Sequence, residues 1–162
     1  AGIVMSRILI AYFSTGGTTA KLAAGLAKEL EADVYEIRPK EPYTEKDLNW
    51  VNPLSRSTKE YVSKKEPEIL GHVENMEQYD TVIIGAPIWF FKVPNIVNRF
   101  LKQYDFAGKK MGLFVTSHKA GVEKAESAAK EICPKARWGK GILANNMNAA
   151  DLAAWAKGIM KD

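Results

Sequence analysis

The segment Arg7-Ile-Leu-Ile-Ala-Tyr-Phe13 runs directly into Ser14-Thr-Gly-Gly-Thr-Thr19. The first part is short and almost entirely apolar, which is typical of a strand buried on both faces of a parallel sheet. The second part contains only residue types that favour turns and helix caps. Leu22, Leu26 and Leu30 then recur at helical spacing. These residues predict a strand, a loop and a helix in succession.

The same alternation repeats along the chain. Alternation of apolar and polar residues predicts a second strand at 34–37, and further strands are predicted at 81–86, 111–116 and, more weakly, 136–143. Helical spacing predicts helices that begin near residue 94 and span 122–132 and 148–160. Strands that alternate with helices indicate an α/β fold with a parallel sheet. We expect one domain over residues 1–162, with 1–6 a flexible N-terminus or an expression remnant.

One long segment, residues 39–78, breaks the alternation, and we call it the excursion. It contains four prolines and many charged residues, and it shows little periodicity apart from one short helix predicted at 57–64. A connection of this length within one domain is usually functional or mobile.

Composition excludes several classes of protein. The chain has 162 residues, 46% hydrophobic and 26% charged, which is typical of a globular domain and not of a disordered one. No apolar run approaches the roughly 18 residues that a membrane span needs. The only cysteine, Cys133, cannot form an internal disulfide, and residues 1–6 lack the pattern of a secretory signal. We therefore expect a cytoplasmic protein without a membrane partner.

Charge is distributed unevenly along the sequence. The chain carries 23 basic and 19 acidic residues, for a net charge of +4. Residues 92–140 hold 11 basic and 4 acidic groups (net +7), whereas residues 1–91 hold 10 and 13 (net −3). The basic segment has no obvious nucleic-acid-binding motif, so we expect no nucleic acid partner. The charge instead favours an anionic substrate or an acidic partner.

The first loop, residues 14–19, has the properties of a phosphate site. Ligands of open α/β sheets bind at the carboxyl ends of strands, and a helix N-terminus offers N–H groups and a positive dipole end. Glycines let the backbone approach an anion, and hydroxyls add donors. The absence of Lys and Arg favours a single terminal phosphate, although an ordinary capped turn explains the same residues equally well. The candidate residues are Ser14, Thr15, Gly16, Gly17, Thr18 and Thr19.

Other phosphate-binding motifs are absent. The first loop lacks the Gly-Lys-Ser/Thr ending of a P-loop and the Gly-x-Gly-x-x-Gly fingerprint of dinucleotide sites. No cysteine lies near it, which argues against a cysteine-dependent phosphatase. The two histidines and one cysteine have no metal-ligand spacing, so we predict no metal site and no catalytic side chain.

Two more loops follow predicted strands. The aromatic loop, residues 85–94, contains three consecutive aromatic residues that cannot all enter one core, so we expect at least one at the surface. Trp89 offers a flat face for stacking on a planar ring, with simple core packing as the alternative. The third loop spans residues 116–121. Its candidate residues, with those of the aromatic loop, are Pro87, Ile88, Trp89, Phe90, Phe91, Thr116, Ser117, His118, Lys119 and Gly121.

The chain resembles the flavodoxin-like family, in particular its short bacterial FMN-binding members. The resemblance covers residues 7–160, and the matching motifs are Ile8-Leu-Ile-Ala-Tyr-Phe-Ser14, Glu36-Ile-Arg-Pro-Lys-Glu-Pro-Tyr43, Ser55-Arg-Ser57, Gly85-Ala-Pro-Ile-Trp89 and Tyr104-Asp-Phe-Ala-Gly-Lys109. It implies a three-layer α/β sandwich with a five-stranded parallel sheet in order 2-1-3-4-5. It also implies non-covalent FMN, with the phosphate in the first loop, the ring against Trp89 and the pyrimidine edge at the third loop.

The sequence departs from its relatives in three respects. Relatives commonly have Thr at Gly16 and a Gly-rich stretch at His118-Lys119, and the electron carriers among them are typically acidic. A cation at 118 or 119 would stabilise the negative charge of reduced FMN, so we hypothesise a raised reduction potential. Arg56, on the excursion, could reach the flavin rim or a substrate, or lie on the surface.

The leading interpretation is an FMN-binding redox protein that mediates electron transfer with a partner protein or a small-molecule acceptor. The first alternative is an NAD(P)H-dependent FMN reductase of quinones or similar acceptors, with the excursion shaping a substrate pocket. The second is a binding module that has lost FMN. The sequence leaves the oligomeric state open.

Overall fold

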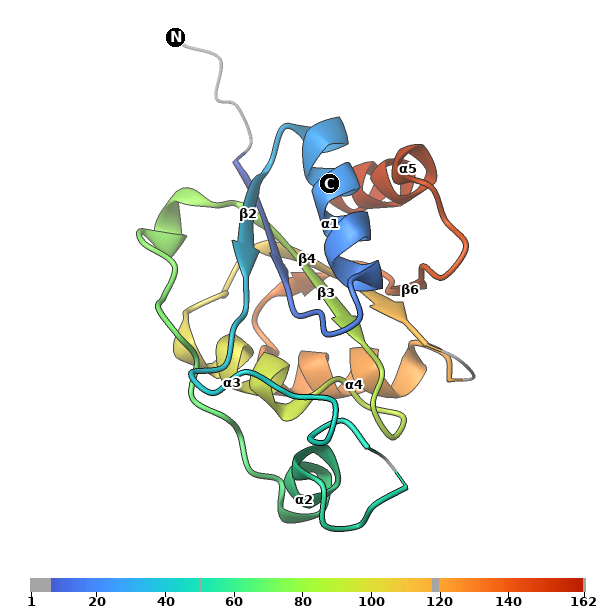
Figure 1. Cartoon of the computed structure of the whole chain (residues 1–162). Helices are drawn as coiled ribbons and strands as arrows, with labels where there is room; N and C mark the ends of the chain where they lie inside the picture. The colour runs from blue at the N-terminus through green and yellow to red at the C-terminus, as the bar shows by residue number, and fades with distance from the viewer. Residues whose placement is uncertain (1–6, 50, 118–119, 162) are drawn as a thin grey trace, which may run out of the picture.

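The computed structural model describes residues 7–49, 51–117 and 120–161 (Figure 1). Its strands are β1 Ile8–Tyr12, β2 Asp33–Glu36, β3 Thr81–Pro87, β4 Lys110–Thr116, β5 Arg137–Trp138 and β6 Ile142–Leu143. Its helices are α1 Thr18–Leu30, α2 Arg56–Ser63, α3 Asn95–Gln103, α4 Glu123–Ile132 and α5 Ala149–Met160, together with the 3₁₀ turn η1 Met76–Gln78.

The strands form a parallel sheet in the order β2-β1-β3-β4-β5, which confirms the predicted order 2-1-3-4-5. The prediction of one continuous fifth strand at 136–143 was wrong. That position is divided between β5, which pairs with the start of β4, and β6, which pairs with its end. Gly139 lies between them, and a Cβ there would stand 2.5 Å from Ile159 of α5. Close packing against α5 therefore accompanies the interruption.

Helices cover both faces of the sheet (Figure 1). Helices α1 and α5 pack on one face, and α3 and α4 pack on the other. The central strands β1 and β3 are buried on both faces, with Ile10 and Ile83 fully inaccessible. This explains why their sequences are nearly continuous apolar runs. The resulting three layers place the carboxyl ends of the central strands at one end of the molecule.

The excursion leaves the sheet after β2 and returns before β3. An antiparallel bridge joins Pro39, at the start of the excursion, to Ile69, in its last third. Helix α2 begins after Ser55, whose side chain caps it by accepting from the N–H of Thr58, close to the predicted start at residue 57. Figure 1 shows α2 outside the three layers, beyond the carboxyl ends of the strands. The short turn η1, with Met76 buried, was not predicted.

Among the described residues, none of the helices combines the length and the apolar character needed to cross a bilayer. Cys133 is buried. His72 is exposed and lies 2.8 Å from Glu74.

Candidate functional site

The three loops that follow β1, β3 and β4 contact one another. The hydroxyls of Thr19 and Thr116 lie 3.1 Å apart, although 97 residues separate them. The N–H of Ile88 donates to the carbonyl of Thr116 at 2.8 Å, and the N–H of Phe13 donates to that of Gly85 at 3.0 Å. The three loops therefore lie together at the carboxyl ends of the central strands.

The first loop presents free backbone donors to solvent. Helix α1 begins at Thr18, and its N-cap residue, Gly17, has a φ of 88° and supplies no side-chain cap. The N–H groups of the first helical turn have no partner within the helix, so they are available to an anion. Ser14 shapes the turn by accepting from the N–H of Gly17 at 3.1 Å. A Cβ at Gly16 or Gly17 would meet no heavy atom within 4 Å, so the space beside the backbone of the first loop is open. This open space in front of the N–H groups fits a phosphate group.

The hydroxyls of the first loop are not equivalent. Thr15 and Thr18 are exposed, whereas Thr19 is only 2% exposed and its hydroxyl contacts Thr116. Thr19 therefore links the first and third loops from inside. From the sequence, all of these hydroxyls were predicted to be similar donors, because no local pattern indicates the contact between Thr19 and Thr116.

Trp89 is half-buried where the aromatic loop meets the end of β1. Its ring centroid lies 5.5 Å from that of Phe13 and 5.3 Å from that of Tyr43. The interplanar angles are 81° and 83°, so both neighbours meet Trp89 edge to face and neither stacks flat on it. This packing fixes the indole beside the first loop.

The rest of the aromatic loop is a tight turn. Trp89 and Lys92 exchange two backbone hydrogen bonds, and Phe90 and Phe91 between them have φ values of 48° and 68°. Bulky residues rarely adopt positive φ, so the turn is strained. Phe90 packs on Tyr61 of α2 at 4.4 Å, and Phe91 is 58% exposed. The prediction that at least one of the three aromatic residues lies at the surface is confirmed.

The third loop is anchored by a residue that the sequence analysis missed. Asn145, after β6, accepts from the N–H of Ser117 at 2.8 Å and donates to the carbonyl of Ser117. Its position directly after a strand end is the signal that could have identified it. Ser117 also accepts from the N–H of Ala120 at 2.9 Å, and Gly121 is exposed. His118 and Lys119 lie outside the described residues, so the hypothesis about their charge stays a prediction.

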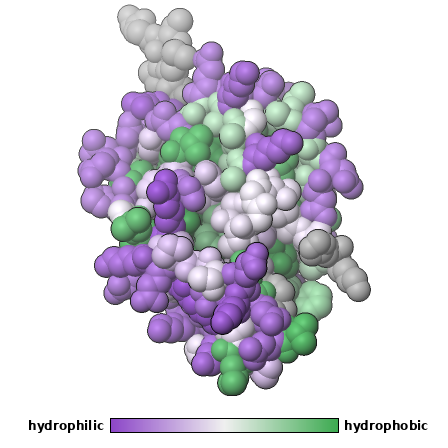
Figure 2. Space-filling model, in the orientation of Figure 1, coloured by the Kyte–Doolittle hydropathy of each residue, from purple (hydrophilic) through white to green (hydrophobic). Residues whose placement is uncertain are grey.

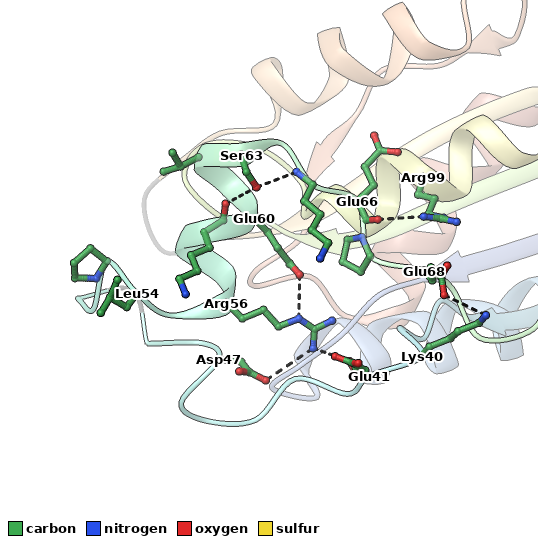
Figure 3. Close-up of a pocket in the computed structure, with 15 residues that line it drawn as sticks. Lys40, Glu41, Asp47, Leu54, Arg56, Glu60, Ser63, Glu66, Glu68 and Arg99 are labelled. Carbon is green, nitrogen blue, oxygen red and sulfur yellow. Dashed lines mark hydrogen bonds and ion pairs between the residues drawn. The ribbon is translucent and has the colours of Figure 1, made fainter.

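A large hollow lies elsewhere in the described part of the chain. It measures about 1160 Å³ and is lined by excursion residues and Arg99 of α3, with none of the candidate residues of the three loops (Figure 3). Several of its charged side chains pair with one another, as in Lys40–Glu68 and Arg56–Glu60. Arg56 is partly buried here, which does not match a role at the surface. Within the described residues, no group of His, Cys, Asp or Glu side chains could hold a metal ion.

Comparison with known proteins agrees with this architecture. The family model for flavodoxin matches residues 7–159, nearly the whole chain. The chain belongs to the flavodoxin family. A candidate flavoprotein from Bacteroides eggerthii is 37% identical over 98% of this chain and 100% of its own, with a TM-score of 0.91. A second, from Bacteroides uniformis, is 38% identical over 94% and 98%, with a TM-score of 0.88.

A more distant flavodoxin-fold structure carries a ligand. It is a flavoprotein from Lactobacillus acidophilus in complex with FMN, 19% identical over 93% of this chain and 99% of its own, with a TM-score of 0.75. At that identity the likeness shows the shared fold alone. A search of the curated proteins finds no match to the sequence.

Proposed function

We propose that this flavodoxin-family protein binds FMN non-covalently at the carboxyl ends of β1, β3 and β4 and serves in electron transfer. The observation that carries the proposal is the open, uncapped N-terminus of α1 beside the half-buried Trp89, within three loops that hydrogen-bond to one another. The Lactobacillus acidophilus flavoprotein in complex with FMN, which shares the fold, supports the choice of ligand.

The residues present fit FMN at both of its ends. The first loop would hold the phosphate through the N–H groups of α1 and the hydroxyls of Ser14, Thr15 and Thr18. Trp89 would stand against the ring system, and the third loop would meet its pyrimidine edge. Bound FMN supplies transfer of one or two electrons, while the protein binds the flavin, orients it and limits its contact with water.

Two lysines beside the aromatic loop favour negatively charged redox partners. The ammonium of Lys92 lies 6.0 Å from the ring centroid of Tyr61, and that of Lys124 lies 5.2 Å from that of Phe91. The end of the molecule that carries α2 is mostly hydrophilic, with a few apolar side chains at its lower edge (Figure 2), and Leu54 and Val62 of the excursion are more than 70% exposed. We propose that an acidic redox protein or an anionic small acceptor approaches here.

Reoxidation kinetics test this proposed approach. Added salt should slow the reoxidation of the reduced protein by ferricyanide, an anion, and should speed its reoxidation by hexaammineruthenium(III), a cation, because salt screens the attraction of the first and the repulsion of the second. The same salt dependence for both acceptors would contradict the proposed approach.

Reduction by NAD(P)H separates a carrier from a reductase. A carrier should stay oxidised when mixed with NADH or NADPH alone and become reduced only when a separate reductase is added. Rapid bleaching by either nucleotide would identify the protein as a reductase. The hollow of the excursion does not itself argue for the reductase, because none of the candidate residues of the three loops lines it.

A further inference from the structure

A cluster of polar side chains in the excursion reaches Trp89. Glu60 of α2 is only 8% exposed, and each of its carboxylate oxygens has its own partner. The hydroxyl of Tyr43 donates to Oε1, and Nε of Arg56 donates to Oε2 at 3.0 Å. The two partners therefore hold this carboxylate from two directions.

Arg56 makes further contacts within the same cluster. Its Nη1 donates to the carbonyl of Glu41 at 2.7 Å and lies 3.9 Å from the carboxylate of Asp47 (Figure 3). Its guanidinium carbon stands 4.0 Å from the ring centroid of Tyr43. These contacts direct the guanidinium into the excursion. They also hold its positive charge in place opposite the carboxylate of Glu60.

Tyr43 transmits the position of Glu60 to the aromatic loop. Its ring lies edge to face with both Trp89 and Phe13, at 5.3 and 5.9 Å. Burial, followed by the hydrogen bond to Glu60, raises the pKa of Tyr43 well above its ordinary value, so its hydroxyl stays a donor. Asn95, at the start of α3, donates to the carbonyl of Glu60 at 2.8 Å and ties α2 to the segment that follows the aromatic loop.

We propose that Glu60, held by Arg56, is a positioning residue that fixes Trp89 through the ring of Tyr43. This inference rests on the proposed function, because Trp89 is the side chain that the flavin ring would contact. Removing the charge of Glu60 weakens its hold on Arg56, since the guanidinium then keeps only its longer ion pair with Asp47, at 3.9 Å. The excursion thereby controls the ring end of the flavin site and not the phosphate end.

Glu60→Gln tests the proposal through two ligands that share a ring. FMN and riboflavin carry the same isoalloxazine, and riboflavin lacks the phosphate. Flavin fluorescence titrations should show both dissociation constants raised by the same factor, about fivefold, a fraction of what one charged hydrogen bond contributes. Glu66→Gln is the matched control, because Glu66 lines the same hollow but pairs with Lys102 at 2.5 Å. It should change neither constant.

Tryptophan fluorescence of the flavin-free protein provides a second readout. Glu60→Gln and Tyr43→Phe should each change the emission, and both changes should vanish in a Trp89→Phe background. If Glu60→Gln weakens FMN but not riboflavin, or if its emission change survives without Trp89, the proposal is wrong. Should the wild-type protein bind neither flavin, the proposed function fails, while the fluorescence comparison still decides whether Glu60 positions Trp89.

Discussion

Replacing Gly16 with Thr should tighten FMN binding. No heavy atom lies within 4 Å of the place where a Cβ on Gly16 would stand, and its φ is outside the positive range that Gly17 adopts. A threonine therefore fits without strain and adds a hydroxyl to the first loop. A hydrogen bond to a charged group contributes about 1.5–3 kcal/mol. Because the loop is exposed, we take the lower end, which corresponds to about tenfold in affinity.

Titration of three proteins with two flavins isolates the contribution of the hydroxyl. Gly16→Val has nearly the shape of Gly16→Thr but no hydroxyl, so it should bind FMN no more tightly than the wild type. Neither variant should bind riboflavin more tightly, because the new donor faces the phosphate. The reasoning is refuted if valine matches threonine, if riboflavin gains as much as FMN, or if Gly16→Thr gains nothing.

Three further predictions concern the structure around the site. Gly85→Ala should destabilise the protein by about 1–3 kcal/mol, because its Cβ would stand 2.2 Å from the ring of the fully buried Phe114; an unchanged urea midpoint would show that the ring can withdraw. Asn145→Ala should cost about 1–2 kcal/mol through the loss of two hydrogen bonds to Ser117, and a melting temperature equal to that of the wild type would contradict this. Burial raises the pKa of Cys133 from 9.0 to about 11. The unfolded thiol therefore ionises first, and stability should fall as pH rises from about 9 to 11. The free energy of unfolding of Cys133→Ala, measured with denaturant at each pH, should fall less over this range than that of the wild type. If both proteins lose the same free energy between pH 9 and 11, the decline belongs to other groups.

The central strands were predictable because their signal is local. The apolar runs of β1 and β3 record burial on both faces, and the glycines and hydroxyls after β1 record the turn into α1. The interruption between β5 and β6 has only a weak local signal, the glycines at 139 and 141. It accompanies the approach of Gly139 to Ile159, two residues that are far apart in the sequence.

The candidate site was predictable as three loops but not as a set of contacts. Residue types at strand ends identified the loops and the exposure of one aromatic residue. The burial of Thr19, the anchoring role of Asn145 and the contacts of Arg56 depend on distant partners, so no local pattern encodes them. Charge alone also left Arg56 open to a role at the flavin rim, whereas its contacts place it inside the excursion.

Equilibrium titration of the purified protein with FMN, followed by visible absorption, tests the central claim most directly. The account predicts one bound FMN per chain, with a flavin spectrum perturbed from that of free FMN and recovered as free FMN on denaturation. A colourless protein that takes up no added FMN would contradict it.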